Sequence, residues 1–94
     1  MPYRFEWNHD KAAANEREHG VSFREATDAF GDVLSLNMPD PDHSGTEERF
    51  LVLGLSQRGR LLVVSYAERG SRTRLISARL ASRPERRRYE ENVP

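Results

Sequence analysis

Three consecutive strand-like segments constrain the fold more than any other feature of the sequence. They span residues 49–55 (RFLVLGL), 60–68 (RLLVVSYAE) and 73–81 (TRLISARLA) and are rich in Leu, Val and Ile, a composition typical of β-strands. The segments SQRG and ERGSR join them in order, and both are typical of tight hairpin turns. The sequence therefore predicts an antiparallel meander in its second half.

The first half predicts a short strand at residues 3–6 and then two helices. Asn8 is a good N-cap for a helix from His9 to His19, and Gly20 follows at the left-handed position that ends many helices. Ser22 and Glu25 have the spacing of a capping box for the second helix. A buried stripe is expected on that helix, formed by Phe23, Ala26 and Phe30.

Two further elements complete the predicted fold. Residues 33–38 (VLSLNM) alternate as a strand does, and a Pro- and Asp-rich loop follows at 39–48. After the meander, Ser82 and Glu85 form another capping box for a final helix at 83–91. The order β-α-α-β-β-β-β-α predicts one α+β domain over residues 1–94. Its antiparallel sheet carries two N-terminal helices and one C-terminal helix.

Composition excludes several classes of protein. The chain has no cysteine, which excludes disulfide scaffolds and thiolate zinc sites. No apolar run approaches the roughly 18 residues of a membrane span, and no signal-peptide pattern is present, so we expect a cytoplasmic protein without membrane contact. Hydrophobic residues make up 36% of the chain, which favours a dimer or a stabilising partner. His9, His19 and His43 lack metal-ligand spacing, so neither a metal nor a cofactor is expected.

Charge is divided unequally along the chain. Residues 1–48 carry a net charge of −7, and residues 49–94 carry +7, all of their basic residues being arginines. This asymmetry favours an anionic partner for the second half, and a guanidinium binds phosphate or carboxylate through two parallel hydrogen bonds. The alternative is that the two halves neutralise each other within the fold. Four of these arginines are expected to form a solvated face of the last helix: Arg83, Arg86, Arg87 and Arg88.

Hairpin geometry predicts which side chains meet. If residues 56–59 form the first turn, Leu55 faces Arg60 and Arg49 faces Tyr66. A two-residue second turn would then place Arg79 beside Arg60, whereas a three-residue turn would exchange the faces of the last strand. Adjacent arginines repel each other unless an anion joins them. The pattern predicts a phosphate or carboxylate site at Arg60 and Arg79, or else salt bridges to Glu85 or another acid.

One helix face near the N-terminus is a separate candidate. Lys11, the only lysine, lies four residues from Asn15, which lies four residues from His19, so all three share a face. A histidine in the last turn interacts favourably with the helix dipole. We therefore expect a mainly structural face, with Lys11 and His19 as possible secondary members of an active site.

The sequence resembles the BrnT toxins. The resemblance covers roughly residues 5–90 and rests on W-x-x-x-K-x-x-x-N-x-x-x-H-G, E-R-x-x-x-x-G and I-S-A-R. It implies a RelE-like ribonuclease fold and the toxin half of a type II toxin–antitoxin pair, which cleaves RNA without a metal and inhibits translation. It also implies a BrnA-type antitoxin, typically in a two-plus-two heterotetramer, through which alone the complex would bind operator DNA.

The residues suggest how such cleavage would be divided. Arg60 and Arg79 are the expected phosphate clamp, and Glu68 is the candidate for acid–base chemistry, because arginine is a poor general base. Five further residues are candidate RNA contacts: Arg49, Tyr66, Arg69, Arg74 and Tyr89. The alternative function is a non-catalytic, arginine-rich module that binds an acidic protein or nucleic acid.

Overall fold

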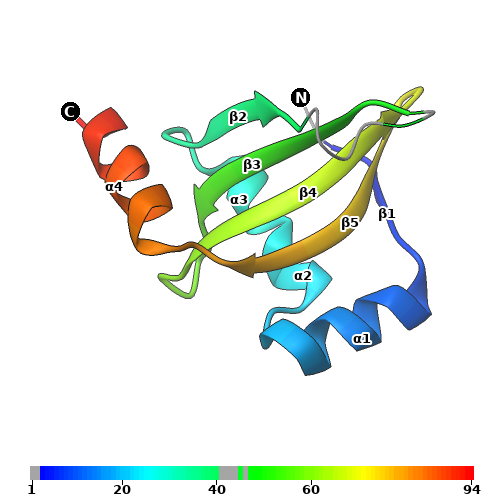
Figure 1. The fold of residues 1–94 in the computed structure, drawn as a ribbon. Coiled ribbons are helices and arrows are strands. Elements are labelled where there is room, and N and C mark those ends of the chain that lie inside the picture. The colour runs from blue at the N-terminus through cyan, green and yellow to red at the C-terminus, as the bar shows by residue number, and fades with distance from the viewer. Residues whose placement is uncertain (1–2, 41–44, 46) are drawn as a thin grey trace.

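The computed structural model describes residues 3–40, 45 and 47–94, and it confirms an α+β fold. A five-stranded sheet has the order β1-β5-β4-β3-β2 (Figure 1). Its strands are β1 (Phe5–Glu6), β2 (Leu36–Pro39), β3 (Arg49–Leu55), β4 (Leu61–Arg69) and β5 (Arg72–Leu80). The helices are α1 (His9–His19), α2 (Phe23–Ala26), α3 (Asp28–Gly31) and α4 (Arg83–Asn92).

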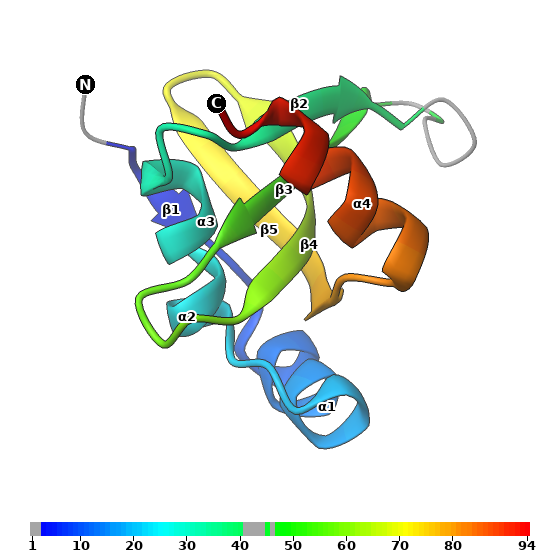
Figure 2. The same cartoon turned by 90° about the vertical axis from the view of Figure 1, so that its left-hand side faces the viewer.

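The helices divide between the two faces of the sheet. Figures 1 and 2 show α1, α2 and α3 on one face and α4 at one end of the other. The larger core cluster lies under the first group and includes Phe23, Ala26, Phe30, Val52 and Val64. A smaller cluster lies between the sheet and α4 and consists of Leu53, Leu61 and Val63 of the sheet and Tyr89 of α4. We call the face that carries α4 the open face, because α4 covers only part of it.

The predicted helix ends are largely confirmed. The Asn8 side chain accepts a hydrogen bond from the Lys11 N–H at 3.0 Å, and Gly20 adopts φ 70° after α1. The second predicted helix is interrupted at Thr27, which separates α2 from α3. Its predicted capping box is only half formed, since Ser22 accepts from the Glu25 N–H but the Glu25 carboxylate binds other groups.

The strand pairing differs from the prediction by one residue. Leu55 pairs with Leu61, and Arg49 with Ala67, because the first hairpin turn contains three residues, 57–59. The Ser56 N–H donates to the Arg60 carbonyl at 2.8 Å, and Gly59 adopts φ 79°, a geometry typical of three-residue turns. A one-residue shift exchanges the faces of every side chain on a strand. The prediction of an antiparallel sheet holds for β2 to β5 but is wrong for β1, which pairs with β5 in parallel.

Asn15 fixes α1 to the edge of the sheet. Its side-chain amide donates to the Ala78 carbonyl at 2.8 Å and accepts from the Ala78 N–H at 3.1 Å, as a neighbouring strand would. A third hydrogen bond goes to the Val21 carbonyl at 3.0 Å. The face of Lys11, Asn15 and His19 was expected to be structural. Asn15 is the one buried residue of α1.

Gly54 allows α3 to approach the sheet closely. A Cβ atom at this position would lie 2.5 Å from the carbonyl oxygen of Ala29. Close packing between α3 and β3 thus explains the glycine that ends the E-R-x-x-x-x-G motif.

Candidate active site

A hollow of about 220 Å³ lies on the open face of the sheet. We call it the open-face hollow. It is lined by Asp40, Arg49, Leu51, Val63, Ser65, Ile76, Ser77 and Arg79. A smaller hollow of about 70 Å³ adjoins it under α4, sharing Leu51 and Val63 and adding Glu85 and Arg88.

Strand alternation brings these side chains together. Val63 pairs with Arg79, and Ser65 pairs with Ser77, and residues that pair directly share one face of a sheet. Arg49 precedes the partner of Ser65, Leu51, by two residues and therefore lies on the same face. The hollow thus has one guanidinium from β3 and one from β5, with serine hydroxyl groups from β4 and β5.

Arg79 is held in place by Glu85. Its two terminal nitrogens donate to the two carboxylate oxygens of Glu85 at 2.8 and 2.9 Å. Glu85 is fixed in turn by the capping box with Ser82, whose backbone N–H donates to Oε1 at 2.8 Å. The hydrogen bonds from Arg79 are the main cause that lowers the pKa of Glu85 to about 2, against the opposing effect of burial.

This pairing leaves part of the Arg79 guanidinium for another anion. A guanidinium can form two parallel hydrogen bonds at its end, through both terminal nitrogens, or at its side, through Nε and one terminal nitrogen. Glu85 occupies the end. The Arg79 side chain is 43% exposed and lines the hollow, and its hydrogen bonds to Glu85 and to the Leu80 carbonyl are made by the terminal nitrogens.

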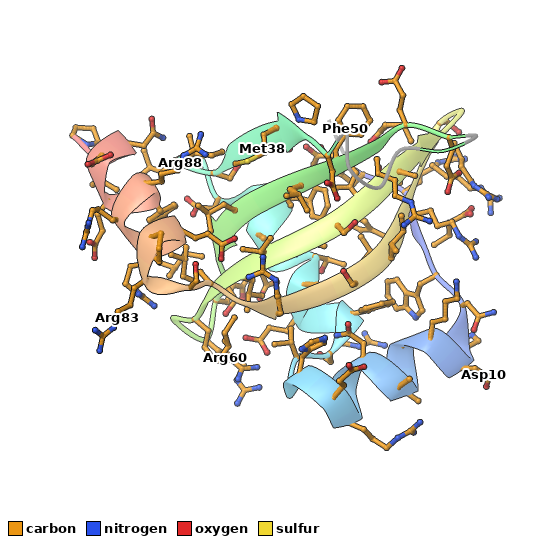
Figure 3. All side chains as sticks on the ribbon, in the orientation of Figure 1. Asp10, Met38, Phe50, Arg60, Arg83 and Arg88 are labelled. Carbon is orange, nitrogen blue, oxygen red and sulfur yellow. The ribbon has the colours of Figure 1, made fainter. Side chains whose placement is uncertain are left out.

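Arg60 does not join Arg79, which corrects the predicted clamp. Arg60 directly follows the first hairpin turn and donates to Glu25 through Nε at 2.9 Å and to the Gly20 carbonyl at 3.0 Å. Gly20 ends α1 and Glu25 lies in α2, both on the helix-covered side of the sheet, and Figure 3 shows Arg60 projecting toward α1. The alternative that each arginine forms a salt bridge is the one confirmed.

Glu25 is the buried carboxylate that binds Arg60. Its side chain is 5% exposed and also accepts from the Ser56 hydroxyl at 2.9 Å and from Arg58 at 3.4 Å. The hydrogen bonds from Arg60 are the largest influence on the pKa of Glu25 and, with those from Ser56, they keep it below its usual range although burial acts to raise it.

Tyr66 and Glu68 lie on the helix-covered side, away from Arg49 and Arg79. The Tyr66 ring packs on Phe30 and Phe50, and its hydroxyl donates to Asn37 at 2.7 Å. Burial raises the pKa of Tyr66 to about 12. Glu68 follows Tyr66 on the same side and is five residues beyond Val63, the partner of Arg79. That is roughly 16 Å along the strand, so Glu68 does not reach a phosphate held by Arg79.

The remaining predicted RNA contacts are dispersed. Arg69 is paired with Glu47 at 3.3 Å, and Arg74 with Glu6 at 3.3 Å. Arg74 lies on the open face. It pairs with Ala67 on β4, which pairs in turn with Arg49 on β3. Tyr89 is the buried residue of α4 and packs on the sheet beside Leu53, Leu61 and Val63.

The Tyr89 hydroxyl donates to Asp32 at 2.5 Å. Burial, together with that hydrogen bond, raises the pKa of Tyr89 to about 12. Lys11 and His19 are exposed on α1, on the other side of the sheet. His43 lies outside the described residues.

Sequence reasoning missed Asp40, Ser65, Ser77 and Ile76. The serines lie opposite each other on β4 and β5, and a correct register would have placed them beside Arg79. Within the described residues no three His, Asp or Glu side chains are grouped to hold a metal ion. No helix in the same part of the chain is long and apolar enough to cross a membrane.

Comparisons with known proteins place the chain in a family. The family described as ribonuclease toxin, BrnT, of type II toxin–antitoxin system matches residues 7–85. The crystal structure of the Brucella abortus ribonuclease toxin BrnT matches with a TM-score of 0.68 and 20% identity, covering 87% of this chain and 100% of that chain. No curated protein sequence matches the chain. Because the family match extends over most of its length, the chain belongs to the BrnT family of ribonuclease toxins, and a type II toxin implies an antitoxin partner.

Proposed function

We propose that the chain is a RelE-like, metal-independent endoribonuclease that cleaves RNA in the open-face hollow and thereby inhibits translation. The observation that carries the proposal is that Arg49 and Arg79 line one hollow with two serine hydroxyls. A hollow with two guanidinium groups suits a phosphodiester. Membership of a ribonuclease toxin family supports RNA as the molecule that supplies this phosphodiester.

The reaction requires no covalent intermediate on the protein. The RNA 2′-oxygen attacks the adjacent phosphorus, the O2′–P bond forms, and the P–O5′ bond breaks. A base accepts the 2′-hydroxyl proton, and an acid protonates the leaving 5′-oxygen. The products are a 2′,3′-cyclic phosphate and a 5′-hydroxyl end.

Each lining group has a task in this scheme. The Nε side of Arg79, oriented by Glu85, binds a phosphoryl oxygen and stabilises the charge that develops there. Arg49 positions the neighbouring backbone, and the hydroxyls of Ser65 and Ser77 donate to RNA oxygens. Asp40 is the described carboxylate that lines the hollow, and we assign it to proton transfer in place of Glu68.

The partners follow from the same assignment. We propose a BrnA-type antitoxin that neutralises the toxin in a two-plus-two complex, with operator DNA bound through the antitoxin alone. The toxin would act in the cytoplasm, where its RNA substrates are found.

The test is RNA cleavage by the purified protein with excess EDTA. We expect cleavage to persist, with 2′,3′-cyclic phosphate ends identified by mass spectrometry. Loss of cleavage in EDTA with recovery on adding Mg²⁺ would contradict metal independence. Binding of RNA without any cleavage would favour a non-catalytic arginine-rich module instead.

A further inference from the structure

The C-terminal helix carries arginines that the open-face hollow does not use. Arg83, Arg86 and Arg87 lie in the first half of α4 and are exposed. We call them the outer arginines. Figure 3 shows Arg83 projecting away from the sheet, whereas Arg88 lies toward β2, where it lines the smaller hollow beside Met38.

The outer arginines differ from the arginines of the sheet in their pairing. No ion pair within the described part of the chain involves them. In contrast, four arginines on β4 and β5 are each paired with a glutamate: Arg69, Arg72, Arg74 and Arg79. These four arginines share three glutamates, since Arg72 and Arg74 both contact Glu6, whereas the charge of the outer arginines is left for solvent or a ligand.

The stability of α4 does not explain this placement. A helix dipole favours acidic side chains near the N-terminus and basic ones near the C-terminus. In α4 the arginines lie in the first half, no basic residue lies in the last turn, and Glu90 and Glu91 lie near the end. Arg86 and Glu90 also have the less favourable orientation for a pair four residues apart. The charge order thus opposes helix stability, as is expected when charges are placed for binding.

The basic half of α4 is also the half that adjoins the hollow. Ser82 caps this end and Glu85 lies in the first turn, where Glu85 binds Arg79, a residue that lines the hollow. A strand of RNA that leaves the hollow past Arg79 passes Arg88, which lines the smaller hollow, and then reaches the outer arginines on the first half of α4. The glutamates at the far end of α4 would repel a strand that continued along the whole helix.

We propose that the outer arginines bind the phosphate backbone of single-stranded RNA beside the scissile phosphodiester. This inference rests on the proposed ribonuclease function and adds a backbone-binding surface outside the hollow. Its contacts are to phosphates, so it would increase affinity without selecting a base sequence. It would act only on substrates long enough to extend from Arg79 onto α4.

The test compares two variants that lose equal charge. In the first, the outer arginines are replaced together by glutamine, which preserves helix propensity. In the matched control, three exposed arginines elsewhere are replaced: Arg4, Arg17 and Arg24. Fluorescence anisotropy measures the Kd of a 2′-O-methyl RNA of about twenty nucleotides, which resists cleavage, at several KCl concentrations, because phosphate contacts release counterions.

The expected result is a change in salt dependence for the first variant only. The slope of log K against log[KCl] should become shallower by about 2, since each phosphate contact on a single strand contributes about 0.7. Affinity near physiological salt should fall on the order of tenfold to a hundredfold. An equal slope in both variants and the wild type would overturn the inference. The inference would also be overturned if the outer-arginine variant kept the wild-type salt slope for RNA but lost binding to duplex DNA of the same length.

Cleavage of a short RNA separates this inference from the proposed function. We expect the wild type and the outer-arginine variant to cleave an RNA of about four nucleotides equally, because the strand is too short to leave the hollow. Failure of the wild type to cleave any RNA would reject the ribonuclease function. Cleavage by the wild type with equal salt slopes would reject the role of the outer arginines alone.

Discussion

The guanidinium of Arg79 and the carboxylate of Glu85 form two parallel hydrogen bonds at 2.8 and 2.9 Å. The pair joins the last residues of β5 to the first turn of α4. It therefore links the position of α4 to the orientation of the arginine that lines the open-face hollow. Glu85 is a positioning residue in this account, because it acts on RNA only through Arg79.

Glu85→Gln tests that role. Glutamine can still accept the capping hydrogen bond from Ser82, but it can no longer hold Arg79 by two charged hydrogen bonds. We expect kcat to fall about tenfold or more, on the scale of a lost positioning contact, with a smaller change in KM. Glu90→Gln, on the same helix, is the control. Equal kcat values for Glu85→Gln and Glu90→Gln would show that the pair is only structural.

The same pair predicts a pH dependence of stability. The pKa of Glu85 is about 2 in the folded protein, against an ordinary value of 4.5. A lowered folded pKa contributes stability that is fully present above the unfolded pKa and is lost as the pH falls through the folded one.

Melting curves of the wild type and Glu85→Gln should therefore differ by a constant amount above about pH 5 and converge between pH 4.5 and about 2. A difference that persists unchanged at pH 2 would refute the ion pair as its cause.

Arg60 is expected to support the fold. Arg60→Ala removes the main partner of the buried Glu25 carboxylate, and a buried carboxylate without a partner is destabilising. We expect the melting temperature to fall by roughly 5 °C or more. Arg58→Ala is the control, because the Arg58 side chain is 71% exposed and its contact with Glu25 is long at 3.4 Å. Similar melting temperatures for the two variants would contradict the assignment.

Asn15 should contribute more to stability than its neighbours on the same helix face. Asn15→Ala removes three hydrogen bonds and leaves the Ala78 N–H and carbonyl without their partner. We expect the free energy of unfolding to fall by about 2 kcal/mol. Lys11→Ala and His19→Ala alter exposed side chains and should leave denaturant midpoints close to the wild type. A larger loss in His19→Ala than in Asn15→Ala would reverse this ranking.

Local signals predicted most of the fold. Asn8 and Gly20 define α1, and the capping box at Ser82 defines the start of α4, because caps depend on residues close in sequence. The sheet register depended on the first hairpin turn and on a register shift between Ser65 and Tyr66, which follows a second turn of two residues and places Arg79 opposite Val63. Reading SQRG as a four-residue turn moved Arg60 and Tyr66 to the wrong face, whereas Gly59 in a left-handed conformation closes a three-residue turn.

The candidate site could be outlined only in part from the sequence. Arg49 and Arg79 were identified, and the structure places both in the hollow. Arg60 was misplaced because its partner Glu25 lies 35 residues earlier, a separation that no local pattern reveals. Ser65 and Ser77 carry no motif, and only the observed pairing of β4 with β5 brings them together.

Comparing Arg79→Gln with Arg60→Gln tests the central claim most directly. Both replacements remove one arginine that is paired with a glutamate, but only Arg79 lines the open-face hollow. Initial rates of RNA cleavage are measured with excess EDTA, well below both melting temperatures. We expect Arg79→Gln to be slower than the wild type by about a hundredfold to a thousandfold, the scale of a lost charge-stabilising donor. Arg60→Gln should retain most of the rate, and the opposite order would contradict the assignment of the active site to the open face.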